Sequence, residues 1–227
     1  MTDDARKHDM LAVVAGRQAV YDFLAQLFLN PIPTPGHDYA QTVLRAIDDY
    51  ACVSDLDDFR DGMRSLKSYK ATAERGALEE VQRQLAVDRT RLCRGTAKDG
   101  AIAPPYEAPY LMPHKETDQL VAIVQLYRRA GLKITADQRE RMDYIGVELA
   151  FMAELCAKER AALVAADTTA YDAVLALERE FLQNHLLKWA VDYCGAMIAH
   201  AQTDFFRGIG YLMRAFLHEE RELYDQV

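Results

Sequence analysis

The sequence predicts an all-α fold. Apolar residues recur along most of the chain at the 3.6-residue spacing of a helix, and no segment shows the apolar and polar alternation of a strand. Prolines and glycines cluster between these periodic segments, where one helix ends before the next begins. With 227 residues, 50% of them hydrophobic, the chain is long enough to bury one large core. We therefore expect a single compact bundle of about nine to ten helices.

The first half of the chain covers about residues 8–94. Its first helix is expected over about 8–29, because Val13, Val20, Leu24 and Leu27 share one face, and it ends at the prolines that follow Asn30. The remaining helices of this half are expected over about 37–50, about 55–68 with Ser54 as N-cap, and about 77–92.

A proline segment lies within a linker of about residues 95–116. Pro104, Pro105 and Pro109 remove backbone donors and fix φ, so an extended or turning chain is expected there. The same segment holds Tyr106, Glu107 and Tyr110. A connection of this length in a compact domain is usually functional or disordered, so it is the first candidate for a recognition site.

The second half, about residues 117–227, is helical again. Helices are expected over about 118–130, 136–165, 169–186, 187–201 and 203–218. Gly131 follows the first of these and suits a left-handed C-terminal cap. The helix over 136–165 carries apolar or small residues on several faces, which is typical of a helix surrounded by others.

Three polar residues of the second half are candidates for chemistry. Glu148 falls inside an apolar arc of its predicted helix, so it needs a partner, either an internal Arg or Tyr hydroxyl or a cationic ligand. Asp143 lies one turn after the expected helix start, where negative charge also favours the helix dipole. His185 precedes Trp189 by four residues, which favours a packing pair over a general base, and spacing ties no second titratable group to it.

Composition and motifs exclude several classes of function. The chain has 35 acidic and 27 basic residues, a net charge of −8 that argues against nucleic acid as a partner. Phosphate-loop, zinc-protease and esterase signatures are absent, and neither the four cysteines nor the six histidines show metal-site spacing. We predict no catalytic residue, metal or cofactor. The polar N-terminus and the lack of a long apolar run predict a cytoplasmic protein without membrane association.

Several segments, taken in their order along the chain, form a distinctive pattern. The segments of the first half and the linker are Tyr21-x-x-Leu24-Ala25-x-Leu27-Phe28-x-x-Pro31, Arg89-Thr90-Arg91-Leu92 and Pro105-Tyr106-Glu107-x-x-Tyr110. Those of the second half are Tyr127-x-x-x-Gly131-Leu132, Glu140-x-x-Asp143-Tyr144-Ile145-x-x-Glu148-Leu149-x-Phe151-Met152 and Phe181-Leu182-x-x-His185-Leu186-x-x-Trp189. In this order the segments resemble those of the TorD/DmsD/NarJ family of redox-enzyme maturation chaperones.

The resemblance implies a cytoplasmic chaperone for a molybdoenzyme catalytic subunit precursor. Such a protein binds the precursor and its twin-arginine signal peptide, assists cofactor insertion and prevents premature export. A twin-arginine signal joins cationic groups to an apolar segment, so its receptor needs carboxylates beside an apolar wall. We expect Glu107, Asp143 and Glu148 to supply the carboxylates. The expected peptide groove is completed by Tyr106, Tyr110, Tyr144, His185 and Trp189.

The chain departs from the family pattern at two places in this expected groove. It reads Glu140-Arg141-Met142-Asp143-Tyr144 where the family often has Glu-Pro-x-Asp-His. It also reads Ala108-Pro109 where Ser-Val is common between Glu107 and Tyr110. Both departures bear on which client subclass is bound.

Two other functions remain open from the sequence. One is a small helical enzyme that uses Glu148 with His185, and the other is a nucleotide-responsive regulator, although no phosphate loop is present. The long linker between helical halves would also permit a homodimer formed by exchange of halves.

Overall fold

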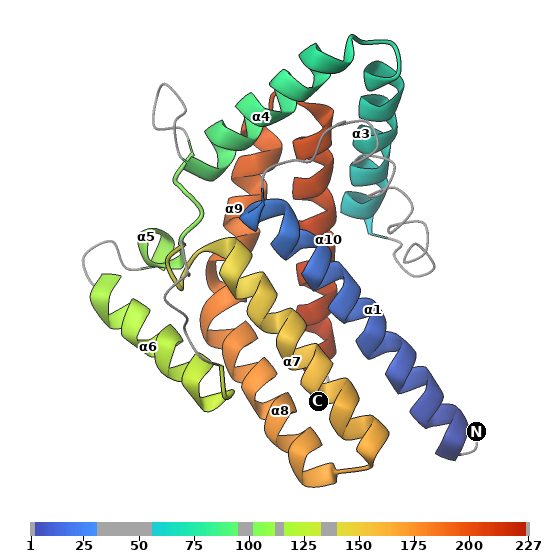
Figure 1. Cartoon of the computed structure of the whole chain (residues 1–227), viewed down its shortest axis with the longest axis vertical. Coiled ribbons are helices and arrows are strands. Elements are labelled where there is room, and N and C mark those ends of the chain that lie inside the picture. The colour runs from blue at the N-terminus through green and yellow to red at the C-terminus, as the bar shows by residue number, and fades with distance from the viewer. Residues whose placement is uncertain (1–2, 31–55, 95–101, 112–115, 133–139, 226–227) are drawn as a thin grey trace. The chain divides into compact units, whose positions relative to one another are not determined.

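The computed structural model describes residues 3–30, 56–94, 102–111, 116–132 and 140–225 (Figure 1). Helices make up most of these ranges, and no strand occurs within them, which confirms the all-α fold class. The helix expected over about 37–50 and its neighbour Ser54 lie outside the described residues. None of the described helices is long and apolar enough to cross a membrane.

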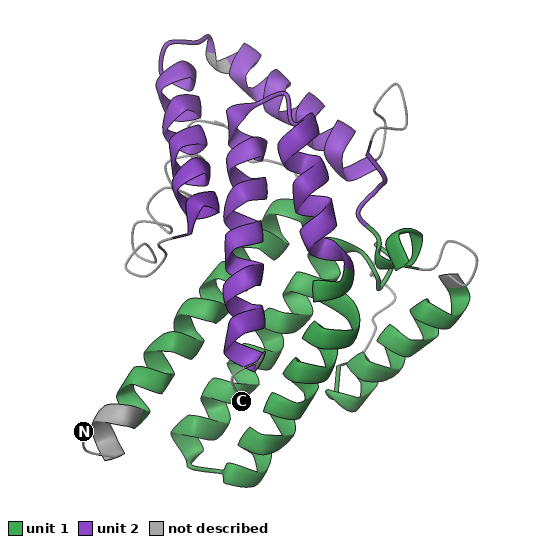
Figure 2. Ribbon diagram, turned by 180° about the vertical axis from the view of Figure 1, so that it is seen from behind, with its two compact units in different colours: residues 1–29, 106–188 green, residues 30–105, 189–227 purple. Residues whose placement is uncertain are grey.

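The chain divides into two compact units, each built from segments on both sides of the proline segment (Figure 2). Unit 1 comprises Met1–Leu29 and Tyr106–Lys188, and unit 2 comprises Asn30–Pro105 and Trp189–Val227. Neither unit is a continuous stretch of sequence. The two helical halves expected from the sequence therefore do not correspond to the two units.

Unit 1 is organised around the pairing of α1 (Asp3–Leu29) with α7 (Ile145–Ala165), which run side by side (Figure 1). The other side of α7 packs on α8 (Thr168–Phe181), so α7 is central within this unit, as its apolar faces predict. At the crossing with α1, a Cβ on Gly146 would lie 2.9 Å from Leu29 Cγ. The missing side chain thus permits close approach of the two helices.

Three further elements complete unit 1. They are α5 (Glu107–Leu111), α6 (Glu116–Arg129) and the π-helical turn η1 (Leu182–Leu186) that follows α8. Gly131 has φ of 80°, its N–H donates to Arg128 O, and Leu132 N–H donates to Tyr127 O. These two bonds form the Schellman cap that Gly131 predicts for the end of α6.

Unit 2 contains α3 (Asp57–Ala73), α4 (Leu78–Arg94), most of α9 (Leu187–His200) and α10 (Asp204–Asp225). Helices α3 and α10 pack through two glycines, because a Cβ on Gly208 would lie 3.0 Å from the carbonyl oxygen of Gly62. The buried carboxylate of Asp88 on α4 accepts hydrogen bonds from Gln202 N–H and Thr203 N–H at the start of α10. A side chain from another helix thereby caps α10.

Two boundaries that the sequence predicts around the proline segment and its contacts are wrong. Helix α7 begins at Ile145 and not near Ala136, since residues 140–144 form turns and an extended position at Tyr144, whose ψ is 136°. Asp143 therefore precedes the helix instead of lying one turn inside it. The proline segment, expected to be extended or turning, becomes helical at Glu107. Pro109 is compatible with this helix because it lies in the first turn of α5, where no intrahelical N–H is needed.

Candidate functional site

The candidate site in unit 1 forms where the proline segment meets the turn before α7. Tyr106 and Tyr144 form an isolated antiparallel bridge, and Glu107 N–H donates to the carbonyl oxygen of Asp143 at 2.9 Å. The rings of the two tyrosines lie 5.3 Å apart. Backbone pairing between distant segments thus replaces the helical bonds that the sequence pattern predicts for residues 140–144.

Glu107 is fully buried, and its carboxylate is held by two side chains of unit 1. His185 Nδ1 lies 2.9 Å from Oε1 and 3.1 Å from Oε2, and Gln119 Nε2 donates to Oε1. The imidazole also stacks on the Phe181 ring at 5.4 Å. The pair joins α5 to the π-helical turn after α8, two elements that are distant in the sequence.

Asp143 is also fully buried, and a guanidinium from the same turn covers it. Arg141 donates from Nε to Oδ1 at 3.0 Å and from Nη2 to Oδ2 at 2.9 Å. Ala108 N–H donates to Oδ2 at 3.3 Å. The Arg141 guanidinium carbon lies 5.1 Å from the centre of the Tyr106 ring, within cation–π range.

Tyr106 and Tyr144 are fixed by hydrogen bonds at their hydroxyl groups. Tyr144 donates to the carbonyl oxygen of Phe28 at 3.1 Å, so it ties the site to the end of α1. Tyr106 donates to Glu140 Oε2 at 3.3 Å. Tyr144 is fully buried whereas Tyr106 is half-buried, so the Tyr106 side of the pair is the one that reaches the surface.

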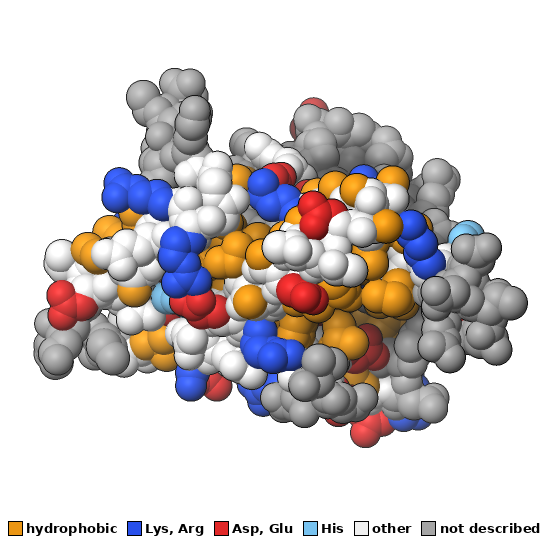
Figure 3. Space-filling view, turned by 90° about the horizontal axis from the view of Figure 1, so that it is seen from below, with side chains coloured by type: hydrophobic (Ala, Val, Ile, Leu, Met, Phe, Trp, Pro, Cys, Tyr) orange, Lys and Arg blue, Asp and Glu red, His pale blue; other side chains and the backbone are white. Residues whose placement is uncertain are grey.

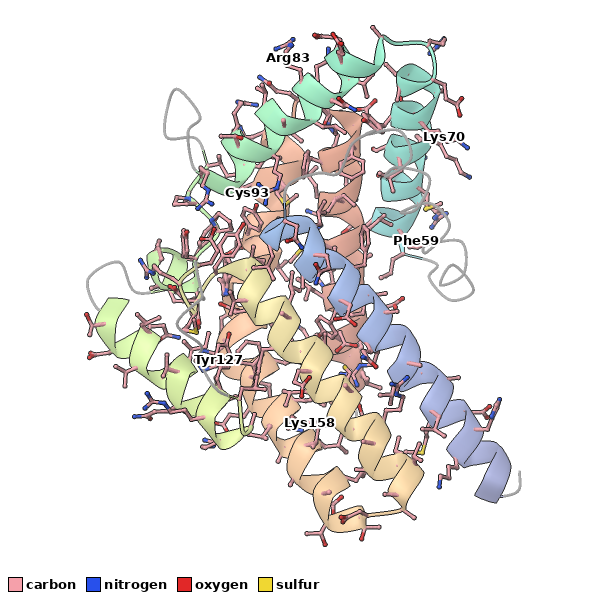
Figure 4. All side chains as sticks on the ribbon, viewed as in Figure 1. Phe59, Lys70, Arg83, Cys93, Tyr127 and Lys158 are labelled. Carbon is pink, nitrogen blue, oxygen red and sulfur yellow. The ribbon has the colours of Figure 1, made fainter. Side chains whose placement is uncertain are left out.

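Glu148 and Tyr127 lie on the inner side of this cluster. Glu148 is fully buried, as its place in an apolar arc predicts. Tyr127 points from α6 toward α7 and α8, contacts the rings of Phe151 and Phe181, and donates to Met142 O at 2.9 Å (Figure 4). Burial raises the pKa of the Tyr127 phenol well above its ordinary value. Negative charge raises this pKa further, and its sources are Glu148, Glu107 and Asp143.

The three carboxylates predicted for the site, those of Glu107, Asp143 and Glu148, therefore lie close together in unit 1, around the buried Tyr127 phenol. A tight group of buried acids requires cations or donors, which Arg141, His185 and Gln119 supply. A cation from outside that binds Asp143 or Glu107 would therefore replace one of these partners.

A family model described as the nitrate reductase delta subunit matches residues 56–195. The chain belongs to this family. The nitrate reductase delta subunit family is part of the TorD/DmsD/NarJ redox-enzyme maturation chaperones, so the resemblance carried by the motifs is confirmed. Its members are chaperones of molybdoenzymes and not a family of catalysts. Comparison with curated proteins gave no match.

The remaining predicted site residues of this nitrate reductase delta subunit family member lie at different places. Tyr110 is half-buried on α5, in unit 1 with the cluster. Trp189 is fully buried, belongs to unit 2 and packs on Tyr193 with ring centres 6.1 Å apart. The alternative of an enzyme with Glu148 and His185 gains no support, since the Nδ1 atom of His185 faces Glu107.

A second buried polar cluster in unit 1 is structural. Arg17 on α1 pairs with Glu159 on α7 at 2.9 Å and with Glu178 on α8 at 2.7 Å. Cys156 lies beside the two carboxylates, and within the described ranges these three residues are grouped closely enough to hold a metal ion. Arg17 pairs with both carboxylates, so the cluster joins three helices.

Large hydrophobic side chains also remain exposed on unit 1. They are Met10, Val13, Val121 and Val164. Figure 3 shows one face of the molecule, on which hydrophobic and charged side chains are mixed. Single exposed apolar residues are normal on a protein surface, so they define no site.

Proposed function

We propose that this chain is a cytoplasmic chaperone that binds a molybdoenzyme precursor through its twin-arginine signal peptide, with Asp143 as the main acceptor of a signal arginine. The observation that supports this role is the bidentate contact between Asp143 and a guanidinium, that of Arg141, on the face of the Tyr106 ring. Arginine binds carboxylates and aromatic faces by these same contacts.

The three predicted carboxylates differ in how readily they can take part. Asp143 is paired with Arg141, whose side chain is 42% exposed. Glu107 is enclosed by His185 and Gln119 from other elements, and Glu148 is fully buried. Asp143 therefore binds the signal arginine in this proposal, while Glu107 and Glu148 add negative potential.

The apolar wall of the proposed site comes from the tyrosines of unit 1. Tyr106 and Tyr144 lie in contact beside Asp143, and Tyr110 follows on α5. Trp189 belongs to unit 2, so its part in peptide binding stays a prediction from the sequence.

The proposal is tested by calorimetric titration with a synthetic twin-arginine signal peptide and a twin-lysine counterpart. Wild-type protein should bind the arginine peptide more tightly, because lysine cannot make the bidentate contact. Asp143→Asn should weaken binding of the arginine peptide by about tenfold or more, as loss of a charge-assisted contact worth about 1.5–3 kcal/mol requires. Asp118→Asn, which removes an exposed carboxylate on α6, is the matched control and should bind normally.

Equal weakening by Asp143→Asn and Asp118→Asn would contradict the proposal. That result would show that the acidic protein attracts the peptide only through its net charge, without a specific site.

A further inference from the structure

We propose that Arg141 is an internal competitor that occupies the arginine-binding site of this chain and must leave before a client arginine can bind. This inference rests on the proposed function, since it concerns the same carboxylate. It adds a residue that sets the affinity of the site and names the ligand class, an alkylguanidinium.

The geometry of Arg141 is that of a bound ligand. Two of its nitrogens, Nε and Nη2, each donate to a separate oxygen of Asp143, at 3.0 and 2.9 Å. Its guanidinium carbon lies 5.1 Å from the centre of the Tyr106 ring. A planar guanidinium binds well to a carboxylate and to an aromatic face, and Asp143 and the Tyr106 ring supply these two partners.

Exchange at this site begins with the movement of the Arg141 side chain away from Asp143. Arg141 lies two residues before Asp143 in the turn of residues 140–144, and its side chain is 42% exposed while that of Asp143 is 0% exposed. When Arg141 turns away, Asp143 still accepts from Ala108 N–H. At Glu107, by contrast, release of the partners would disturb α6 and the turn after α8.

An internal competitor leaves the site open for only a fraction of the time. The apparent association constant of the client is its value for an empty site multiplied by that fraction. If Arg141 leaves Asp143 open for about a tenth of the time, the client arginine binds about tenfold more weakly than to an empty site. Removal of the Arg141 guanidinium should therefore tighten client binding, although it removes a residue of the site itself.

The first experiment compares Arg141→Gln with Arg128→Gln in the signal-peptide titration. Both substitutions remove one positive charge, and Arg128 is an exposed residue of α6, so a general electrostatic effect is the same in both. We expect Arg141→Gln to bind the twin-arginine peptide about tenfold more tightly than Arg128→Gln. Arg141→Lys should fall between wild type and Arg141→Gln, because a lysine competes without bidentate contact.

The second experiment needs no client. N-ethylguanidinium chloride is titrated into Arg141→Ala, and amide shifts are followed by NMR. Saturable shifts at millimolar probe are expected in Arg141→Ala, and no such shifts in wild type or in the double variant Arg141→Ala/Asp143→Asn. Thermal unfolding of each variant shows beforehand that it is folded, and Arg141→Met replaces any alanine variant that is not.

The two experiments separate the inference from the proposed function. If the peptide binds, Asp143→Asn weakens it and Arg141→Gln matches Arg128→Gln, the competitor role is overturned while the proposed function stands. If the peptide does not bind but Arg141→Ala takes up N-ethylguanidinium through Asp143, the proposed function fails and Arg141 is still the occupant of a guanidinium site. Absence of both effects overturns the inference.

Discussion

At the scale of single residues, the buried pair of Glu107 and His185 connects parts of the chain that are 78 residues apart. Both side chains are almost inaccessible, so removal of either one leaves its partner poorly solvated. We expect a double-mutant cycle with Glu107→Gln and His185→Gln to give a coupling free energy of about 1–3 kcal/mol in urea unfolding. The same cycle on the exposed pair Glu80 and Arg83 should give no measurable coupling.

A small coupling free energy between Glu107 and His185 would contradict this prediction. A coupling as small as that of the exposed pair would mean that Glu107 is stabilised by Gln119 and its other surroundings, and that His185 acts only through its stacking on Phe181.

A second prediction at this scale concerns alkaline stability and Tyr69 on α3. Burial raises the pKa of Tyr69 from 10.0 to about 12. Among the described residues its hydroxyl has no hydrogen-bond partner, while its ring packs on Phe205. A raised pKa means that the unfolded chain ionises first, so the stability that the neutral phenol provides is complete below pH 10 and is lost as pH rises toward 12.

Tyr69→Phe should therefore change the free energy of unfolding little at pH 8 and exceed wild type by about 1 kcal/mol near pH 11. Tyr127→Phe is the matched control, because it loses the bond to Met142 O and should be about 1 kcal/mol less stable than wild type already at pH 8. Urea unfolding at the two pH values measures both. If the curves for Tyr69→Phe and wild type keep the same separation at both pH values, Tyr69 does not titrate as expected.

The acids of the site stand out in the sequence more clearly than their partners do. Glu148 stands out because a carboxylate inside an apolar arc needs a reason, and Glu107 because it lies among prolines and tyrosines. Gln119 carries no such signal, since surface helices contain many residues of its kind. Arg141 is marked in the sequence only as the residue that stands where the family often has proline. The link from Glu107 to His185 depends on contacts across the fold, which no spacing in the chain encodes.

At the scale of elements, the helical pattern predicts which segments are helical but not where each helix begins or ends beside a long-range contact. The interval 140–144 continues the apolar spacing of α7, yet its backbone pairs with the proline segment. The helix expected over 169–186 is regular only to Phe181 and then widens into a π-helical turn, which carries His185. π-Helical turns within α-helices are frequent at functional sites, and they change which side chains face inward.

Two glycines with opposite surroundings give a prediction at this scale. A Cβ on Gly208 of α10 would lie 2.8 Å from Leu66 Cγ and 3.0 Å from the backbone oxygen of Gly62. Gly208→Ala should therefore lower the free energy of unfolding by about 1–3 kcal/mol, in spite of the better helix propensity of alanine. A Cβ on Gly195 of α9 would meet no described atom within 4 Å outside its own helical turn, so Gly195→Ala should raise stability by about 0.5–1 kcal/mol.

Urea unfolding of the two alanine variants measures this difference, with the urea dependence checked to be unchanged. A stabilising effect of Gly208→Ala would show that α3 and α10 do not need the close glycine contact.

At the scale of the whole molecule, each compact unit is built from two segments that are far apart in the chain. In unit 1 the buried side of α1, which includes Tyr21, Leu24 and Phe28, packs on α7, more than a hundred residues later. In unit 2 the N-terminal region supplies α3 and α4, and the C-terminal region supplies α10. The composition of the sequence predicts one compact bundle, but the pairing of distant helices is set by packing, which local patterns do not specify.

This organisation predicts how the protein behaves when it is cut. Fragments 1–101 and 102–227 separate α1 from α7 and α3 from α10, so each fragment would expose an apolar helix face that the whole chain buries. We expect neither fragment alone to unfold cooperatively in urea, as followed by circular dichroism, and the two produced together to form a complex with a single cooperative transition. The control is the full-length chain nicked between residues 95 and 101, which keeps every described helix and should resemble the reassembled pair. A cooperative transition in fragment 102–227 alone would show that α5 to α10 form a stable core without α1, and that the pairing of α1 with α7 is secondary to it.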